Sequence, residues 1–542
     1  MNPIFTEAAG AVVALAIPVT YALAALLTSR QTGAGLFSRG LWATGLALGL
    51  ATVLLGKRVL GGFDPLPHDA APLFVALSQG LRVDGLTTGM LMLVTFLAHV
   101  IVRYSRTYLA GEPGQARYLR WFLATLAAVS LLVAANHLLV VALCWTATSL
   151  AIHQLLTFYP ERPQALIAAH KKFLVSRLGD VLVFGAIGLL GWQVGSLHLD
   201  DVFLWARQTE SLPWPVALAA VLLALGACLK CAQLPFHGWL IQVMEAPTPV
   251  SALLHAGVVN IGGFLMIRLA PLMVKAELAQ FVLVGVGATT AALAALVMTT
   301  RVSIKVRLAW STCAQMGFML VECGLGAYHL ALLHLVAHSL YKAHAFLASG
   351  STVDLWRAGA LETAAPEPRL APWFVNLFLA TAGVAAVGGA FGVNPTHEPS
   401  AWAMAWVLSL AGAALMTRAG AGGLTQGLKG AFYGLAVTTL YFTWHVLVAK
   451  LPLGTENIYD VSPGMFVRLV VTGAVFLGLY VVSALMAARP QSPWARALYP
   501  QLFAGFYLDE FFTRLTFRLW PAKLPPRRSA ERGDFTTQTI GA

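Results

Sequence analysis

The segment Leu223-Ala-Leu-Gly-Ala-Cys-Leu-Lys230-Cys-Ala-Gln-Leu-Pro235 places a lysine and a proline inside a long apolar run. An ionisable side chain at the centre of a lipid bilayer costs about 2.5–3.5 kcal/mol, so such a residue points to a function. The proline removes a backbone hydrogen bond and interrupts the helix. The alternative, a lysine that extends to the membrane surface, fits poorly because Lys230 lies centrally in its run. The segment predicts a broken membrane-spanning helix with a functional charge near its centre.

The composition of the whole chain agrees with a membrane protein. Of its 542 residues, 58% are hydrophobic and 11% are charged, and the mean hydropathy is +0.74. Soluble globular proteins carry about 25% charged residues. This difference excludes a soluble enzyme, a nucleic-acid-binding domain and a disordered chain. The net charge of +12 is then explained by basic residues at the ends of membrane spans.

Apolar windows long enough to cross a bilayer recur along the chain. They predict an all-α polytopic membrane protein with about fifteen transmembrane helices. A final stretch, 488–542, is predicted as an amphipathic tail. The expected spans are 8–27, 41–56, 84–102, 119–134, 137–158, 173–194, 214–241, 249–271, 279–299, 308–323, 328–349, 373–393, 402–418, 431–449 and 465–487.

Lysine and arginine residues are unevenly distributed between alternate loops. The loops after spans one, three, five, nine, eleven and thirteen hold 16 of them, including Lys171, Lys172 and Lys305. The opposite set holds 7, including Arg268. Because basic loops remain in the cytoplasm, this distribution predicts an N-terminus outside and a C-terminus in the cytoplasm.

Two interruptions of apolar spans lie five spans apart. Pro235 interrupts span 214–241, and Gly388, Gly389 and Gly392 interrupt the end of span 373–393. Secondary transporters are often built from inverted repeats with broken helices near the midplane. The spacing predicts two inverted five-helix units flanked by other segments: N-terminal helices 1–118, first unit 119–271, second unit 272–420, C-terminal helices 421–487 and the tail 488–542.

A polar row is expected on the span 328–349. His334, His338 and Lys342 recur every four residues and therefore share one face of a helix. Two histidines at this spacing can bind zinc, but the sequence places no third ligand or glutamate base on that face, and Lys342 would repel a metal ion. The pattern favours a chain of proton-carrying groups over a metal site.

Four further residues are candidates for the same pathway. His255 titrates near neutral pH, although a lone buried histidine is more often a core residue. Asp180 follows Arg177 by three residues near an expected helix start, so a structural ion pair explains the two equally well. Lys305 either anchors a span at the membrane surface or reaches the polar pathway. His153 lies on an uncharged polar face of span 137–158 whose meaning stays open.

The sequence holds no motif for a cofactor or a metal ion in this chain. Its five cysteines lie in or beside apolar spans, and Cys228 and Cys231 form a single CxxC without a second pair. Phosphate-binding and dinucleotide-binding glycine motifs do not occur. Buried thiols usually only pack, so any catalysis linked to this protein is expected in a partner.

Several motifs resemble the proton-pumping, antiporter-like membrane subunits of respiratory complex I and the Mrp cation/proton antiporters. The match covers most of residues 80–420. The motifs are Gly226-Ala-Cys-Leu-Lys230-Cys-Ala-Gln-Leu-Pro-Phe-His-Gly-Trp-Leu240, Ala246-Pro-Thr-Pro-Val-Ser-Ala-Leu-Leu-His255, Ile304-Lys305-Val-Arg-Leu-Ala-Trp-Ser-Thr-Cys-Ala-Gln-Met-Gly317, the stretch from His334 to Ser351, Val83-Asp84-Gly-Leu-Thr87 and Arg177-Leu-Gly-Asp180-Val181.

The resemblance implies two inverted five-helix units, each with a broken helix, and a proton pathway of lysines and histidines near the midplane. It makes Lys230 the channel lysine of the first unit and His255 its neighbour in the next helix. Lys305, His334 and His338 would continue the polar axis into the second unit.

The chain departs from that family at two positions. Pumping members carry a glutamate directly after the tryptophan of the fifth helix, where this chain has Thr146 after Trp145. They also carry a lysine or glutamate in the broken twelfth helix, whereas 373–393 contains no charged residue. On this comparison the channel lysine would lack its carboxylate partner, and the second unit would lack its exit group.

Only 55 residues follow position 487, too few for the lateral helix and anchor span of the largest complex I subunit. With the missing charges, this resembles the membrane subunit of the DAB-type inorganic-carbon transporter. The resemblance implies a non-enzymatic protein of the bacterial inner membrane, in contact with lipid and not with nucleic acid. It would conduct H⁺, or alternatively Na⁺, and drive a large cytoplasmic, carbonic-anhydrase-like partner that carries the zinc.

Two alternatives stay open. The first is a subunit of an Mrp-type sodium/proton antiporter or of a complex I-like proton pump. The second is a non-conducting membrane anchor for a soluble enzyme.

Overall fold

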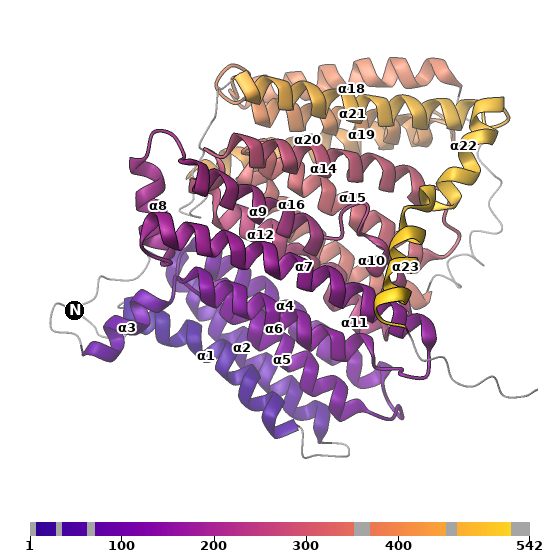
Figure 1. Cartoon of the computed structure of the whole chain (residues 1–542). Coiled ribbons are helices and arrows are strands. Elements are labelled where there is room, and N and C mark those ends of the chain that lie inside the picture. Colours follow the sequence, from indigo (N-terminus) through magenta and orange to yellow (C-terminus); the bar gives the residue numbers. More distant parts are fainter. Residues whose placement is uncertain (1–6, 29–34, 62–70, 352–368, 451–462, 522–542) are drawn as a thin grey trace, which may run out of the picture.

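A computed structural model describes residues 7–28, 35–61, 71–351, 369–450 and 463–521. Within these ranges the chain folds into α-helices and short 3-10 turns, with no β-strand. Most of the long helices run side by side in one bundle (Figure 1). Twelve helices of the described ranges are long and apolar enough to cross a membrane, as the composition predicts.

The helices follow the order of the expected spans. Their bounds are α1 (Glu7–Thr28), α2 (Leu36–Val59), α3 (Pro72–Gly80), α4 (Gly85–Tyr108), α5 (Gln115–Ala134), α6 (Leu138–Leu156), α7 (Pro163–Val194), α8 (Leu199–Gln208), α9 (Trp214–Lys230), α10 (Gly238–Gln242), α11 (Thr248–Ala256), α12 (Ile261–Arg268), α13 (Ala270–Met273), α14 (Glu277–Met298), α15 (Ile304–Gly324), α16 (Tyr328–Leu347), α18 (Leu370–Ala390), α19 (Pro399–Gly420), α20 (Leu424–Lys450), α21 (Pro463–Ala488), α22 (Pro493–Phe503) and α23 (Leu508–Leu519).

Each expected span coincides with one helix or with two consecutive helices. The twelve membrane-length apolar helices do not include α9, which is shorter, or α15 and α16, which carry several polar residues. The count of about fifteen crossings therefore stays a prediction.

The predicted break at Pro235 is confirmed. α9 ends at Lys230, α10 begins at Gly238, and Pro235 lies in the connection between them. Ala232, two residues after the end of α9, has a φ of 54°, a left-handed conformation that does not continue a helix. The next span is also interrupted, by a 3-10 turn at Val258–Asn260 between α11 and α12, which no sequence signal indicated.

The predicted interruption of span 373–393 is wrong at Gly388 and Gly389, whereas Gly392, two residues after the end of α18, has a left-handed φ of 71°. α18 runs without a break from Leu370 to Ala390. Gly388 serves close packing instead, because a Cβ there would lie 2.7 Å from the Trp402 ring and 2.8 Å from the Phe442 ring. A glycine within a helix costs only about 0.5–1 kcal/mol relative to alanine, so it does not have to break one. The boundaries of the two inverted units stay a prediction.

α7 is longer than expected, because Pro163 starts it at the first helical position, where proline is well tolerated. Lys171 and Lys172 lie on this helix and are buried, so their assignment to a cytoplasmic loop is wrong. Asp180 lies more than four turns after Pro163 and is not near a helix start.

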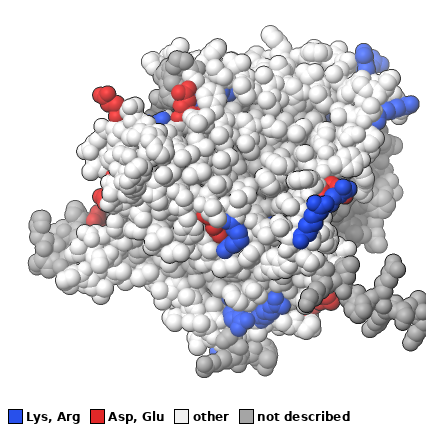
Figure 2. All heavy atoms as spheres, in the orientation of Figure 1, with Lys and Arg blue, Asp and Glu red and all other residues white. Residues whose placement is uncertain are grey.

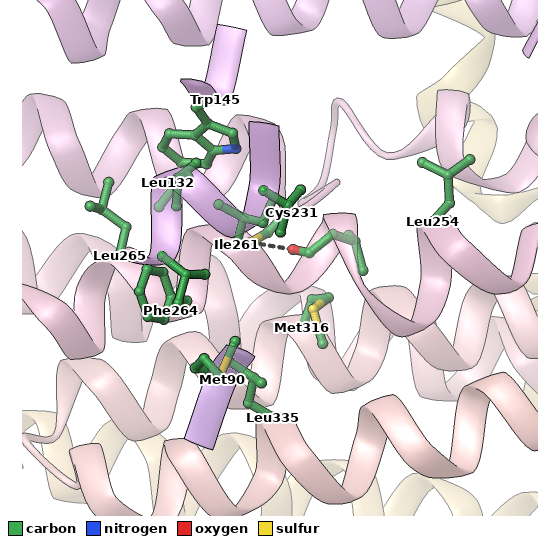
Figure 3. Packing of buried hydrophobic residues seen from close by; sticks show 14 of the residues in the cluster. Met90, Leu132, Trp145, Cys231, Leu254, Ile261, Phe264, Leu265, Met316 and Leu335 are labelled. Carbon is green, nitrogen blue, oxygen red and sulfur yellow. Dashed lines mark hydrogen bonds between the residues drawn. The ribbon is translucent and has the colours of Figure 1, made fainter. Parts of the chain in front are cut away.

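The largest apolar core joins α1, α2, α4–α7, α9–α12 and α14–α16. Figure 3 shows part of it around the broken helices, where the Cys231 thiol donates to the Val259 carbonyl at 3.1 Å. α14 and α15 cross closely through glycines, since a Cβ on Gly287 would lie 2.6 Å from the Gly317 carbonyl oxygen. Smaller clusters pack α18–α21 together and against α14–α16.

The outer face of the bundle is apolar. On the face in Figure 2, charged residues are few and stand in small groups. α7 shows the pattern within one helix: Val181 is 67% and Trp192 is 70% exposed, while Lys171 is fully buried. Apolar side chains outside and charges inside are the arrangement that a lipid environment favours.

The bundle has two ends, which we name after their helices (Figure 1). The α8 end carries α3 and α8, and the α23 end carries α10, α22 and α23. At the α8 end, Asp84 caps α4 by accepting the Thr87 N–H at 2.9 Å, and it pairs with Arg268 of α12 and with Arg82. Burial raises the pKa of this carboxyl, but the two guanidinium groups outweigh burial and hold the pKa of Asp84 well below its usual range.

Candidate ion pathway

Lys230 is the last residue of α9, at the break in that span. Its buried side chain forms an ion pair with Asp180 of α7. Asp180 also pairs with Arg177, with 2.7 Å between Oδ2 and Nη2. The free carbonyls at a helix C-terminus carry partial negative charge. The end of α9 and the Asp180 carboxylate therefore both lower the cost of a buried ammonium group.

The ammonium group of Lys230 also lies over the Trp145 ring, 4.1 Å from its centroid. An indole face attracts a cation. Thr146 follows this tryptophan, but Asp180, from a different helix, supplies a carboxylate to the lysine. The expectation that Lys230 lacks a carboxylate partner is therefore wrong. Asp180 thus pairs with two cations, Arg177 and Lys230.

A second lysine continues this group along α7. Lys172 lies about two turns before Asp180, and its Nζ donates to the carbonyl and hydroxyl oxygens of Ser149 at 2.8 Å and 2.7 Å. It interacts electrostatically with Lys230 and Asp180. His153, one turn after Ser149 on α6, is in electrostatic range of Lys172. Sequence reasoning did not select Lys172, because the loop assignment hid it.

The tail covers this group at the α23 end. Asp509 of α23 accepts hydrogen bonds from Lys171 Nζ at 2.8 Å to each carboxylate oxygen. The Trp520 ring stacks on His170, with centroids 4.0 Å apart and planes 9° from parallel. Gln242 of α10 donates to Asp509 at 3.1 Å, so the tail also contacts the helix beyond the break. The basic stretch 525–528 lies outside the described residues.

A separate group surrounds His255, one residue before the end of α11. Its Nδ1 is hydrogen-bonded to Thr312 Oγ1 of α15 at 3.0 Å. Lys342 of α16 donates to the Leu308 carbonyl of α15 at 3.1 Å, and its charge acts on His255. All of these groups are buried or partly buried. His255 and Lys342 are thus brought together through one segment of α15.

Lys305 lies in the first turn of α15, four residues after Arg301, which donates to the Leu502 carbonyl of α22 at 3.4 Å. Its Nζ donates to Thr248 Oγ1 at 2.8 Å, and Thr248 is the first residue of α11. Thr248 in turn donates to the Tyr108 hydroxyl at 3.1 Å. Lys305 therefore contacts the N-terminus of α11. His255 lies about two turns further along the same helix.

The polar row continues along α16 toward the α8 end. His338 is buried, and neither of its ring nitrogens has a hydrogen-bond partner among the described residues. The His334 ring lies 6.0 Å from it, and His334 Nδ1 is 2.9 Å from Glu322 Oε2 of α15. Sequence reasoning did not select Glu322, although a carboxylate inside the span 308–323 was a visible signal. The described residues contain no group of three potential ligands placed to hold a metal ion.

The structure thus divides the predicted residues into two groups. Asp180, Lys230 and His153 belong to the group on α6, α7 and α9, and His255, Lys305, His334, His338 and Lys342 belong to the group on α11, α15 and α16. Within the described part of the chain, no hydrogen bond or ion pair joins Lys230 to His255. α12 lies between the groups, since it contacts both α9 and α16.

Comparisons with known proteins agree with this architecture. A protein-family profile described as NADH:quinone oxidoreductase/Mrp antiporter, TM, matches residues 135–412, and one described as NADH-Ubiquinone oxidoreductase (complex I), chain 5 N-terminus, matches residues 74–119. A probable inorganic carbon transporter subunit DabB from Hydrogenovibrio crunogenus is 40% identical over 524 residues, which are 96% of each chain. This chain belongs to the DabB family.

Other DabB-family and related sequences are similar over much of the chain. A probable inorganic carbon transporter subunit DabB2 from Halothiobacillus neapolitanus is 37% identical over 532 residues, 95% of each chain. NADH-quinone oxidoreductase subunit L from Mycobacterium tuberculosis is 33% identical over 454 residues, which are 79% of this chain and 67% of that protein.

Two solved structures share the fold of this DabB-family chain. The Mrp complex from Dietzia contains a chain with a TM-score of 0.53 at 24% identity, covering 96% of this chain and 57% of that one. A chain of the archaeal membrane-bound sulfane sulfur reductase has a TM-score of 0.58 at 15% identity, covering 93% and 99%. At these identities the likeness concerns the fold alone.

Proposed function

We propose that this protein is the membrane subunit of an energy-coupled inorganic-carbon accumulation system of a bacterial inner membrane. In it, the protein conducts H⁺, or alternatively Na⁺. The names of its DabB relatives, probable inorganic carbon transporter subunits, support the assignment to carbon transport. The buried charges support ion conduction.

The row of ionisable residues on α16 is the main observation that supports ion conduction. Lys342, His338 and His334 extend over about 12 Å of helix, and His338 and Lys342 are buried. Ionisable groups are costly inside a membrane protein and mark ion pathways. His338, with two nitrogens unpaired among the described residues, is suited to bind water. Water between titratable groups lets a proton pass from one to the next.

We place the α23 end in the cytoplasm and the α8 end outside, because the basic loop residues that remain after Lys171 and Lys172 are set aside still favour the α23 side. An ion from outside would follow α16 from His334 to Lys342 and change the charge near His255. It would then pass by way of α12 to the Lys230 pair with Asp180, and leave beside Lys172. Because Lys230 ends α9 at its break, a change in this ion pair would move α10, on which the tail docks.

The partner in this proposal is a large cytoplasmic, zinc-containing, carbonic-anhydrase-like protein. It would hydrate CO₂ to bicarbonate and release one proton for each molecule. Ion flow through the membrane subunit would drive hydration in one direction, so that bicarbonate accumulates. α10 and α23 are the proposed points of mechanical contact, because they connect the Lys230 break to the cytoplasmic surface.

A second candidate function is a subunit of an Mrp-type sodium/proton antiporter or a complex I-like pump. The family profile over residues 135–412 and the fold likeness to an Mrp complex favour it. Mild detergent extraction separates the two candidates. One large zinc protein that stays bound favours carbon accumulation, and quinone-reductase or small antiporter subunits favour the second candidate.

Uptake of radiolabelled inorganic carbon tests the proposed function in cells that express the chain with its bound partner. Lys230→Ala is expected to abolish accumulation, and Lys429→Ala, at an exposed lysine of α20, is the matched control. Undiminished accumulation in Lys230→Ala would overturn ion coupling. Accumulation that survives a proton uncoupler and a sodium ionophore would favour a non-conducting anchor instead.

A further inference from the structure

A second line of ionisable groups lies at the α8 end of α16. His329, in the first turn of α16, has its Nε2 2.6 Å from Nδ1 of His445 on α20. Nε2 of His445 is paired with the carboxylate of Glu398, directly before α19. His329 and His445 are each 3% exposed, and the Glu398 side chain is 26% exposed. The three groups therefore form a line from the interior of the bundle to its surface.

Helix capping does not account for Glu398. It occupies the N-cap position of α19, where Ser, Thr, Asp and Asn are preferred, and its side chain makes no capping hydrogen bond. The carboxylate turns to His445 instead. The line therefore includes a carboxylate whose position is not explained by the local backbone.

A bridging metal ion does not account for the histidine pair. Zinc lies about 2.0–2.1 Å from each imidazole nitrogen that it binds. A separation of 2.6 Å between His329 and His445 leaves no room for an ion between them, but it fits a short hydrogen bond. The pair is therefore arranged for proton sharing.

We propose that Glu398, His445 and His329 form a proton relay between the outer surface and the α16 row, an inference that rests on the proposed ion conduction. An imidazole bonded through both nitrogens can accept a proton on one and release a proton from the other. Glu398 collects a proton at the surface and passes it to Nε2 of His445. Nδ1 of His445 then gives its proton to His329. One proton moves per cycle. The relay is reset when the His445 ring returns its proton from Nε2 to Nδ1.

The relay places an ionisable group near the outer surface, where α18 offers none. That helix has no ionisable residue from Leu370 to Ala390. His329 lies on the same helix as the α16 row but on a different face: it is five residues before His334, which is about 7.5 Å of helix rise and about 140° of rotation. This step is longer than one hydrogen bond and needs water. His334 Nε2 is buried and without a partner among the described residues, so it is free to accept a hydrogen bond from such a water.

Apolar side chains insulate the relay. Phe442, three residues before His445 in α20, packs with Trp402, Val384 and Val393 in one cluster. Trp444 Nε1 donates to the His329 carbonyl at 3.3 Å. A low-dielectric wall strengthens the hydrogen bonds inside it, so protons would be confined to the line of three groups.

Proton uptake by liposomes that contain the purified full complex tests the relay, with a pH dye inside and a potassium diffusion potential as driving force. Glu398→Gln keeps the size and a hydrogen bond but cannot carry a proton. His445→Ala removes the bridging ring. Both are expected to slow uptake by about tenfold or more, whereas Glu398→Asp keeps most of it. His397→Gln, at the exposed neighbouring residue, is the matched control and is expected to behave as wild type.

A structural role for the cluster would not produce chemical rescue. Added imidazole is expected to restore part of the uptake in His445→Ala, because it can occupy the vacated site and carry a proton. Uptake by Glu398→Gln within about twofold of wild type would overturn the relay, and this variant is at a partly exposed site where folding is tolerant. A wild-type complex that takes up no protons at all would overturn the proposed ion conduction, and the relay with it.

Discussion

Replacing Asp180 with asparagine tests the function of the Lys230 ion pair. The change keeps the side-chain size but removes the carboxylate that pairs with Lys230 and Arg177. Removing one partner of a buried ion pair costs about 3–5 kcal/mol, because the other charge is left uncompensated. Since 1.4 kcal/mol corresponds to tenfold, the charged state of Lys230 would become about 100- to 4,000-fold less favourable relative to the neutral state. A lysine that must gain and lose charge in each cycle would then stop conducting.

Proton uptake by liposomes with the full complex, together with thermal stability in detergent, measures this effect. Asp180→Asn and Lys230→Ala are each expected to lower uptake by about tenfold or more. The double variant should be more stable than Asp180→Asn alone, because only the partly exposed Arg177 then lacks its carboxylate. Asp201→Asn, at an exposed carboxylate of α8, is the matched control.

Two results would refute this reasoning. Uptake by Asp180→Asn within about twofold of wild type, at equal protein level, would mean that the pair does not conduct. A double variant as unstable as the sum of the two single changes would mean that the residues do not act as a pair.

Three further predictions follow from other contacts. Gly238→Ala would place a Cβ 1.4 Å from Asp509 Oδ1, so we expect the tail to leave α10 and limited proteolysis to cut near α23; an unchanged cleavage pattern would contradict the docking. Glu322→Gln should keep the hydrogen bond to His334 but lower proton uptake by about tenfold, with the exposed Glu210→Gln as a control that conducts normally. Asp84→Asn should lower the melting temperature in detergent at pH 7, because the folded-state pKa of Asp84 is held low. Its stabilisation is complete above the ordinary carboxyl pKa of about 4 and is lost progressively as the pH falls from there to the lowered folded-state pKa. The difference between wild type and variant should therefore be smaller at pH 3 than at pH 7, and a constant difference would contradict this explanation.

Most helix positions were predictable from the sequence, because each apolar run must lie in lipid and must satisfy its own backbone hydrogen bonds. Pro235 marked a true break, because proline has no backbone N–H to complete a helical hydrogen bond. The errors concerned the start of α7 and the role of Gly388, which a hydrophobicity profile cannot reveal. α7 begins at Pro163 with polar turns that no apolar window detects, and Gly388 is a contact with Trp402 and not a break.

The ionisable residues of the pathway were also predictable, but their partners were not. Lys230 and the α16 row stood out as charges in apolar runs. Asp180 reaches Lys230 only because α7 packs on α9, and 50 residues separate the two in the sequence. His329 and His445 are 116 residues apart. Such pairings depend on tertiary packing, which no local pattern encodes.

The contact between Lys171 and Asp509 joins residues 338 positions apart. During synthesis, Lys171 enters the membrane long before Asp509 leaves the ribosome. Until translation is nearly complete, the buried amine therefore has no carboxylate to neutralise it, and that end of the bundle stays unsealed. A chain that ended before Asp509 would keep this defect permanently, because Lys171 would then lack this carboxylate.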